Sequence, residues 1–303
     1  MPSLLDQLGI STPVVQAPMA GGWTTPALVA AVSEAGAFGV LAGARLTADE
    51  IRAQIAEVRR LTARRFGLNF LIPAVAASDA VGTLDHPVLS RIRARLGLPE
   101  PGASPPPPAS IEDGLAIAIE ARVPVVGFAM GSPAPYVEPL HAAGALVIAA
   151  VTTVAEAEEA AAAGVDAVVA QGAEAGGHRS TYLAQQSSGV PLVGTMALVP
   201  QVVDAVPVPV IAAGGIMDGR GVRAALALGA EAAQLGTRFL LAAESGTPPA
   251  HRRRLLEATE TDTVVTDAFS GRAARAIRNA FVEAFEEAGV PPLPWPRQGR
   301  AAL

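Results

Sequence analysis

The sequence contains no cysteine and no lysine. Without cysteine the chain forms no disulfide, no catalytic thiolate and no cysteine-ligated metal site. Without lysine it forms no Schiff base, which excludes the lysine-dependent aldolases. Aromatic residues are scarce at 4%, whereas 50% of the residues are hydrophobic and mostly small and aliphatic. This balance favours a parallel α/β protein, whose strands are covered on both faces.

A dense basic surface and long apolar runs are also missing. The net charge of −6 argues against a nucleic-acid partner. Arg252–Arg254 form the one dense basic cluster, which is more typical of a solvated helix turn than of a binding patch. The N-terminus lacks the features of a signal peptide, and no apolar run approaches the roughly 18 residues of a membrane span. We therefore expect a soluble, cytoplasmic protein with no membrane partner.

Short apolar runs alternate with helical patterns along most of the chain. Glycines follow several of the predicted helices, and Thr47 with Glu50 forms a capping-box pattern. The predicted strands are 14–18, 38–41, 66–70, 123–129, 145–149, 165–170, 208–212 and 232–234, and the predicted helices are 25–35, 47–61, 110–121, 134–143, 153–163 and 220–228. Eight strands with helices between them predict an α/β fold, a (β/α)8 TIM barrel. A Rossmann sheet requires a Gly-x-Gly-x-x-Gly turn, which Ala17–Gly22 does not supply.

Two segments interrupt this alternation. Residues 71–109 contain a proline tract at 105–108, which is either a lid beside the site or a plain surface connection. Residues 244–290 contain a helix with Ile277, Phe281 and Phe285 at steps of four, a pattern typical of a core face. We expect a barrel of residues 1–70 and 110–243, a smaller cap and substrate region of 71–109 and 244–290, and a C-terminal tail of 291–303.

Glycine turns follow the predicted strands late in the chain, where TIM barrels hold phosphate. Gly214 and Gly215 follow the seventh strand, and we expect their N–H groups to bind a phosphate, with the helix near Arg220 behind them. After the eighth strand, Gly236 would supply another N–H group and Thr237 a hydroxyl. Each glycine pair alone is also compatible with a simple tight turn. Their succession on consecutive strands favours a phosphate site.

His178 is the main catalytic candidate. It follows Gly176-Gly177 in a loop after the sixth strand, at the end of the barrel where active sites lie. Histidine titrates near neutral pH and therefore suits proton transfer. The alternative is a loop histidine bonded to solvent, but the neighbouring phosphate turns favour a functional role. The other histidines have no such context and no metal-ligand spacing, so we interpret them as structural or exposed: His86, His141 and His251.

Polar side chains also occur where predicted strands end. Asn69 and Gln171 need hydrogen-bond partners there, which either a ligand or a neighbouring loop would supply. Glu174 is interpreted as a loop acid exposed to solvent. No Gly-x-Ser-x-Gly elbow is present, which argues against a serine hydrolase.

At these residues the chain resembles the nitronate monooxygenase family, formerly called 2-nitropropane dioxygenases, which are FMN-binding barrels. The segments that carry the resemblance are Gln16–Ala20, Gly67–Phe70, Gln171–His178, Ala212–Ile216 and Gln234–Phe239. The resemblance implies His178 as the catalytic base or as a residue that holds the substrate over the flavin. It implies FMN contacts at Ala17, Pro18, Met19, Asn69, Gln171, Gly176, Gly214, Gly215, Gln234, Gly236 and Thr237.

The implied reaction oxidises an alkyl nitronate, a small-molecule substrate, with O2 to a carbonyl compound and nitrite. The same loop also resembles FabK-type enoyl-acyl-carrier-protein reductases, and some relatives are quinone reductases that use NAD(P)H. A flavin-free phosphate-binding barrel or isomerase is an alternative of another class. The best-defined nitronate monooxygenases carry tyrosines and a lysine around the substrate. This chain has no lysine, and Tyr136 and Tyr182 are its only tyrosines, so the departure concerns the substrate more than the cofactor. Barrels often pair, so a homodimer is compatible with the sequence, which does not determine the oligomeric state.

Overall fold

The computed structural model describes residues 3–72, 86–97, 108–183, 189–295 and 298–299. The chain divides into two compact units. The barrel unit comprises Met1–Ala74, Pro107–Ala175 and Ser180–Arg252, and the second unit comprises Val75–Pro106, Gly176–Arg179 and Arg253–Leu303. Most of the proline tract, for which a lid and a plain surface connection were both left open, lies outside the described residues.

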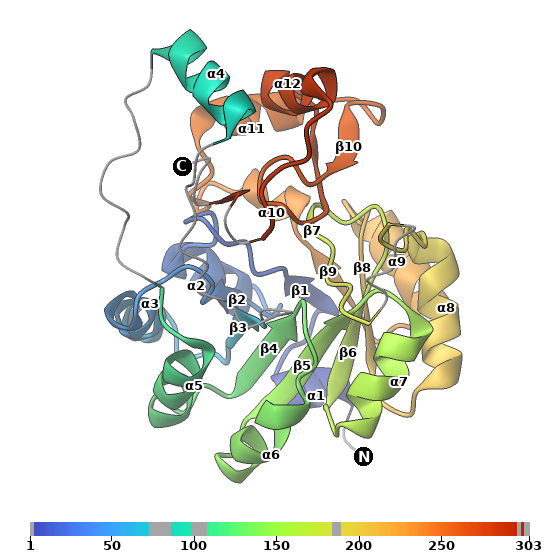
Figure 1. Cartoon of the computed structure of the whole chain (residues 1–303). Helices are drawn as coiled ribbons and strands as arrows, with labels where there is room; N and C mark the ends of the chain where they lie inside the picture. Colours follow the sequence, from blue (N-terminus) through green and yellow to red (C-terminus); the bar gives the residue numbers. More distant parts are fainter. Residues whose placement is uncertain (1–2, 73–85, 98–107, 184–188, 296–297, 300–303) are drawn as a thin grey trace. The chain divides into compact units, whose positions relative to one another are not determined.

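Eight parallel strands form the centre of the barrel unit (Figure 1). Their spatial order is β1-β9-β8-β6-β5-β4-β3-β2, and one isolated bridge between Val15 and Phe38 joins the first strand to the last. The strands are β1 Val14–Gln16, β2 Val40–Ala42, β3 Gly67–Leu71, β4 Val125–Ala129, β5 Leu146–Val151, β6 Ala167–Gln171, β8 Val210–Ala213 and β9 Ala232–Leu235. The predicted (β/α)8 barrel is confirmed, with strand ends shifted by at most two residues.

A buried glutamine side chain completes the seam between β1 and β2. Backbone bonds join Gln16 N–H to the Phe38 carbonyl (2.8 Å) and Phe38 N–H to the Val14 carbonyl (2.9 Å). After these two backbone bonds, Gln16 Oε1 accepts the N–H of Val40 (3.1 Å). A side-chain oxygen thus takes the place of a backbone carbonyl in the hydrogen bonding between β1 and β2. Gln16 Nε2 also donates to Thr24 Oγ1 (3.2 Å). Through this bond to Thr24, Gln16 also holds the loop that follows β1.

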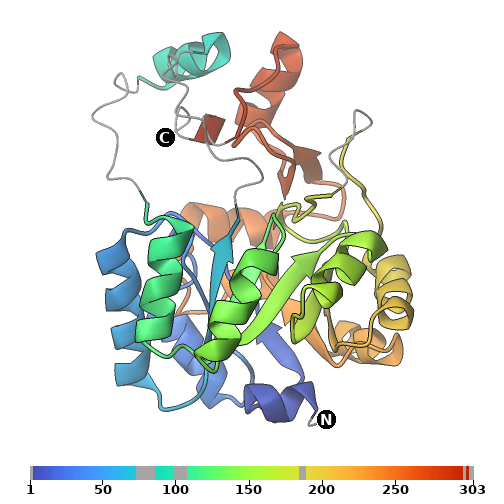
Figure 2. The same cartoon turned by 60° about the horizontal axis from the view of Figure 1, so that its bottom comes forward.

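Helices cover the outside of the strands (Figure 2). They are α2 Pro26–Glu34, α3 Ala48–Leu61, α5 Ile111–Glu120, α6 Ala134–Ala142, α7 Val154–Ala162, α8 Thr195–Ala205 and α9 Gly219–Ala227, with the additional α1 Leu4–Leu8, α10 Thr237–Leu240 and α11 Pro249–Glu257. The predicted capping box of Thr47 and Glu50 is confirmed at the start of α3. Helix α8 was not predicted. None of the helices in the described part of the chain is long and apolar enough to cross a membrane.

Small residues in the barrel unit make room for an aromatic ring between a strand and a helix. The ring of Phe70 on β3 is 5% exposed. A Cβ atom on Gly43 would lie 2.7 Å from this ring, and one on Gly114, inside α5, would lie 2.5 Å from it. Glycine in a helix costs stability, but here any side chain would collide with the core.

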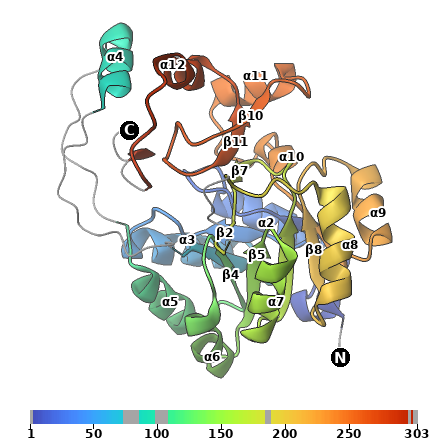
Figure 3. The ribbon, with the colours of Figure 1, turned by 45° about the vertical axis from the view of Figure 1, so that its right-hand side comes forward.

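The second unit contains a small antiparallel sheet (Figure 3). Its order is β10 Thr263–Thr266, β11 Ala274–Ile277 and β7 Gly177–His178. Ile277 therefore lies on a strand, and its predicted place on a helix is wrong. Phe281 and Phe285 do lie on α12 Ala280–Ala288 and pack in an apolar cluster, as predicted.

Helix α4, Pro87–Leu96, packs on the same cluster through Val88, Leu89 and Ile92. Its N-cap is His86, whose buried ring accepts the N–H of Val88 through Nδ1 (3.2 Å) and lies 5.1 Å from the ring of Phe285. The structural interpretation of His86 is confirmed. This helix was missed because its capping residue is a histidine rather than Ser, Thr, Asp or Asn.

Candidate active site

The predicted phosphate turns lie at the C-terminal ends of β8 and β9. Gly214 and Gly215 have φ of 119° and 69°, in the region that favours glycine. A Cβ atom on Gly214 would lie 2.7 Å from Thr195 Oγ1. Among the residues that the structure describes, the amide nitrogens of Gly214, Gly215 and Gly236 donate to no backbone carbonyl. These N–H groups are therefore available to an anion.

The helix behind this turn does not contribute its N-terminus. Asp218 caps α9, and its Oδ1 accepts the N–H groups of Arg220 (2.9 Å) and Gly221 (3.4 Å). The hydrogen bond from the Arg220 side chain lowers the pKa of Asp218 to about 2. A carboxylate therefore already binds two N–H groups at the positive end of α9, and the place of this helix behind the phosphate stays a prediction.

The exposed carboxylate of Glu174 binds the N-terminus of α8. It accepts the N–H of Thr195 (2.8 Å) and its hydroxyl (2.7 Å), while Gly194 at the N-cap supplies no side chain. Thr195 Oγ1 also lies 3.0 Å from the carbonyl oxygen of Gly214. The interpretation of Glu174 as a loop acid exposed to solvent is confirmed, but its structural role was not predicted: through Thr195 it joins the loop after β6 to the turn after β8. Its partner belongs to the helix that sequence reasoning missed.

The loop after β1 adjoins the turn after β9. The N–H of Ala17 donates to the Leu235 carbonyl (2.9 Å), and the N–H of Met19 donates to Thr24 Oγ1 (2.9 Å). A Cβ atom on Gly236 would lie 3.6 Å from Ala17 Cβ and 3.9 Å from Met19 Sδ. The barrel closure thus brings together predicted site residues from opposite ends of the sequence.

Amide side chains end two further strands. Asn69 on β3 lies opposite Gly127 on β4, where a Cβ atom would approach Asn69 Oδ1 to 2.7 Å, so the glycine leaves space for the amide. Gln171 ends β6, and its Oε1 accepts the N–H of Ser180 (2.9 Å). This bond favours the loop-capping alternative for the Gln171 oxygen. Gln234 lies on β9 in register with Ala213 on β8.

The catalytic candidate His178 belongs to the second unit, where it pairs with Ala274 of β11. Its Nε2 lies 2.8 Å from Ser270 Oγ, and its ring meets the Trp295 ring edge-on at a centroid distance of 5.0 Å. Ser270 is 6% exposed and lies in a turn closed by the Gly271 N–H to the Asp267 carbonyl (2.7 Å). Sequence reasoning missed Ser270 and Trp295, because both are far from the histidine in sequence and neither belongs to a motif.

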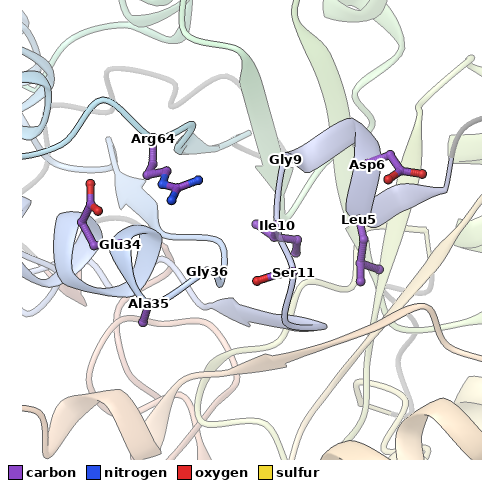
Figure 4. Close-up of a pocket in the computed structure, with 9 residues that line it drawn as sticks. All are labelled: Leu5, Asp6, Gly9, Ile10, Ser11, Glu34, Ala35, Gly36 and Arg64. Carbon is purple, nitrogen blue, oxygen red and sulfur yellow. The ribbon is translucent and has the colours of Figure 1, made fainter.

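One cavity lies outside all of these residues (Figure 4). Its volume is about 440 Å³, and it is lined by Leu5, Asp6, Gly9, Ile10, Ser11, Glu34, Ala35, Gly36 and Arg64. It contains no predicted site residue and therefore gives no support to the catalytic site. In the described part of the chain, no group of three or more His, Asp or Glu residues is arranged to hold a metal ion.

Comparison with known proteins places these features in a family. A family model for nitronate monooxygenase matches residues 2–302. A "Probable nitronate monooxygenase" of Staphylococcus haemolyticus (strain JCSC1435) is 42% identical over 296 residues, which cover 96% of this chain and 82% of the relative. A protein of the same name from Staphylococcus aureus (strain Newman) is 41% identical with the same coverage.

Solved structures agree in fold. The nitroalkane oxidase of Streptomyces ansochromogenes superposes with a TM-score of 0.88 at 40% identity, covering 98% of this chain and 84% of that one. FabK of Thermotoga maritima follows with a TM-score of 0.75 at 35% identity, covering 95% of this chain and 78% of that one. The family match extends over nearly the whole chain, including the glycine turns and the histidine segment. The chain belongs to the nitronate monooxygenase family of flavin-dependent oxidoreductases.

Proposed function

We propose that this chain oxidises alkyl nitronates with O2, using FMN, to a carbonyl compound and nitrite. The observation that carries the proposal is the nitronate monooxygenase match over residues 2–302, which includes both the glycine turns and His178. The nitroalkane oxidase structure at 40% identity supports the same class of substrate.

The donors at the ends of β8 and β9 suit the phosphate of FMN. Gly214, Gly215 and Gly236 present N–H groups that no backbone carbonyl among the described residues accepts, and Thr237 adds a hydroxyl. A phosphate site needs such donors and a backbone without side chains in the way. We propose that FMN is held by these four residues together with Ala17, Pro18, Met19, Asn69, Gln171, Gly176 and Gln234.

We propose that His178 accepts the α-proton of a nitroalkane to form the nitronate, or holds the nitronate by a hydrogen bond. When bound, FMN supplies the electron acceptor for the nitronate. The Ser270 hydroxyl lies 2.8 Å from His178 Nε2 and 3.2 Å from the Arg272 carbonyl oxygen. It therefore accepts a hydrogen bond from Nε2–H while it donates to the Arg272 carbonyl oxygen. In this tautomer Nδ1 is the nitrogen that takes the proton, and the bond to Ser270 is kept in both protonation states of the ring.

A second candidate function is an NAD(P)H-dependent reductase, either of enoyl-acyl-carrier-protein or of quinones. The FabK structure, at 35% identity over 95% of this chain, favours it. The two functions differ in their electron donor. An anaerobic experiment separates them: the FMN-loaded protein is mixed with NADH, with NADPH or with an alkyl nitronate, and the flavin absorbance is followed.

Bleaching by the nitronate and not by either nicotinamide supports the proposed oxidation. Rapid bleaching by a nicotinamide would instead support the reductase. The flavin-free alternative, a phosphate-binding barrel or isomerase, predicts a colourless protein even after FMN is supplied. A yellow preparation that releases FMN on denaturation would remove that alternative.

A further inference from the structure

Glu156 is a fully buried acid near the start of α7. Its Oε2 accepts the N–H (2.7 Å) and the hydroxyl (2.8 Å) of Thr152. Its Oε1 accepts the N–H groups of Tyr182 (2.7 Å) and Leu183 (3.1 Å). Four donors thus surround one buried carboxylate, which satisfies its hydrogen-bonding capacity on two separate stretches of chain.

The position of Glu156 would ordinarily give it a different partner. It lies three residues after the N-cap Thr153, whose hydroxyl accepts the N–H of Glu156 (3.2 Å). In a capping box the acid at this position returns to the N–H of the N-cap residue. Glu50 does so in α3, where it accepts the N–H of Thr47 (2.7 Å). Glu156 departs from this geometry and reaches residues 26 and 27 positions later.

Other contacts hold the same stretch of chain. Tyr182 Oη donates to Glu159 Oε2 (2.5 Å), and the hydroxyls of Thr181 and Thr152 are 2.6 Å apart. Hydrogen bonds from backbone N–H groups and from side-chain hydroxyls therefore fix residues 181–183 to α7 and to Thr152, which follows β5. The histidine segment 176–179 ends immediately before this anchored stretch. The residues that follow the histidine segment are thus held in place, and two of their N–H groups are bound by Glu156.

We propose that Glu156 is a positioning residue for His178, because it fixes the backbone from which the histidine segment emerges. The proposal rests on the proposed function of His178. An error of about 1 Å in the place of a catalytic group costs up to about 100-fold in rate, so the loss of such an anchor would reduce turnover without removing any reacting group. The proposal also explains why the Glu156 carboxylate accepts N–H groups of Tyr182 and Leu183 instead of the N–H of the N-cap residue of its own helix.

The test compares Glu156→Gln with Glu50→Gln in the full-length, FMN-loaded enzyme. Glutamine keeps the size of the side chain but replaces one acceptor oxygen with a donor NH2 group. We expect Glu156→Gln to lower kcat about tenfold, with KM within about twofold and the FMN content unchanged. Glu50→Gln changes an acid at the same helical position without a link to the loop, and we expect its kcat to match the wild type.

A double-mutant cycle then separates positioning from general stability. The rate of anaerobic flavin reduction by nitroalkane is measured in single turnovers for His178→Ala, with and without Glu156→Gln. If Glu156 acts through His178, Glu156→Gln has little further effect once the histidine is gone. An equal loss with and without His178, or no loss in the single variant, would overturn the proposal.

Two further outcomes are distinguishable. Full activity of His178→Ala alone refutes the proposed role of the histidine, and the positioning role with it. If Glu156→Gln does not fold, Tyr182→Phe replaces it, since that variant loses the bond to Glu159 but keeps the peptide N–H that Glu156 accepts. We expect it to lower kcat about threefold in the presence of His178 and not in its absence; any other pattern contradicts the proposal.

Discussion

The glycine turns after β8 and β9 and the segment that carries His178 are built in opposite ways. The turns are local: Gly214 and Gly215 follow their strand directly, and their backbone supplies the donors. The histidine depends on distant residues, because Ser270 and Trp295 come from much later in the chain. We therefore expect substitutions in one region to spare the proposed role of the other, FMN binding by the turns and catalysis by His178.

The largest expected effect is on turnover. We expect His178→Ala to lower kcat with nitroalkane substrates by at least about 100-fold, because general acid–base residues contribute about 10²–10⁴-fold. The FMN content should equal that of the wild type, since the proposed phosphate donors are unchanged. Steady-state kinetics and flavin released per protein check both parts. Loss of flavin together with activity would show that the two regions are not separable.

The converse substitution is in the turn after β8. In Gly214→Ala, the new Cβ would lie 2.7 Å from Thr195 Oγ1 on a backbone with φ of 119°, and such strain costs about 1–3 kcal/mol. We expect FMN affinity to fall about tenfold or more, as measured by quenching of flavin fluorescence. Gly219→Ala is the matched control, because its Cβ would meet no heavy atom within 4 Å and Gly219 is not among the proposed FMN contacts. Equal losses in both variants would contradict the steric account.

A smaller effect is expected at the partner of the histidine. Ser270→Ala removes the hydroxyl that lies 2.8 Å from His178 Nε2. A single hydrogen bond contributes about 0.5–1.5 kcal/mol, so we expect kcat to fall about fivefold and FMN content to stay unchanged. Ser270→Thr keeps a hydroxyl and should recover part of the loss. An unchanged kcat in Ser270→Ala would remove the serine from the account.

The smallest expected effect is on the pH dependence of the stability of the protein, through a histidine in the barrel unit. The His251 ring stacks on Trp23 at 4.9 Å, and burial lowers the pKa of His251 below its ordinary value of 6.5. The folded state therefore favours the neutral ring. This contribution is complete above pH 6.5 and is lost as the pH falls through the lowered pKa. We expect the fall in Tm between pH 7 and pH 5 to be smaller in His251→Phe than in the wild type; equal slopes would contradict this.

Local patterns in the sequence predicted the barrel well. Strand and helix alternation, the Thr47–Glu50 capping box and the glycines after β8 and β9 each depend on residues close together in sequence. The missed features depend on residues brought together by folding. Helix α8 begins at Thr195 after the N-cap Gly194, which supplies no capping side chain, and the N–H of Thr195 is bound by Glu174 from another loop. No local signal marks such a cap.

The same reason explains the errors at the site. Sequence reasoning placed the helix near Arg220 behind the phosphate but did not include Asp218, which caps that helix. Ile277 fitted the four-residue spacing of Phe281 and Phe285, yet it pairs as a strand with Thr263. Spacing alone does not separate a short strand from the helix that follows it. Ser270 had no sequence signal, because its contact with His178 joins residues that lie far apart in the sequence.

The most direct test of the account follows the reaction of the FMN-loaded wild-type protein with an alkyl nitronate in air, without any nicotinamide. The measurement is nitrite formed and O2 consumed over time. The account predicts catalytic formation of nitrite with consumption of O2, and its loss in His178→Ala while the flavin stays bound. Absence of nitrite, in a protein whose flavin is reduced only by NADH or NADPH, would contradict it.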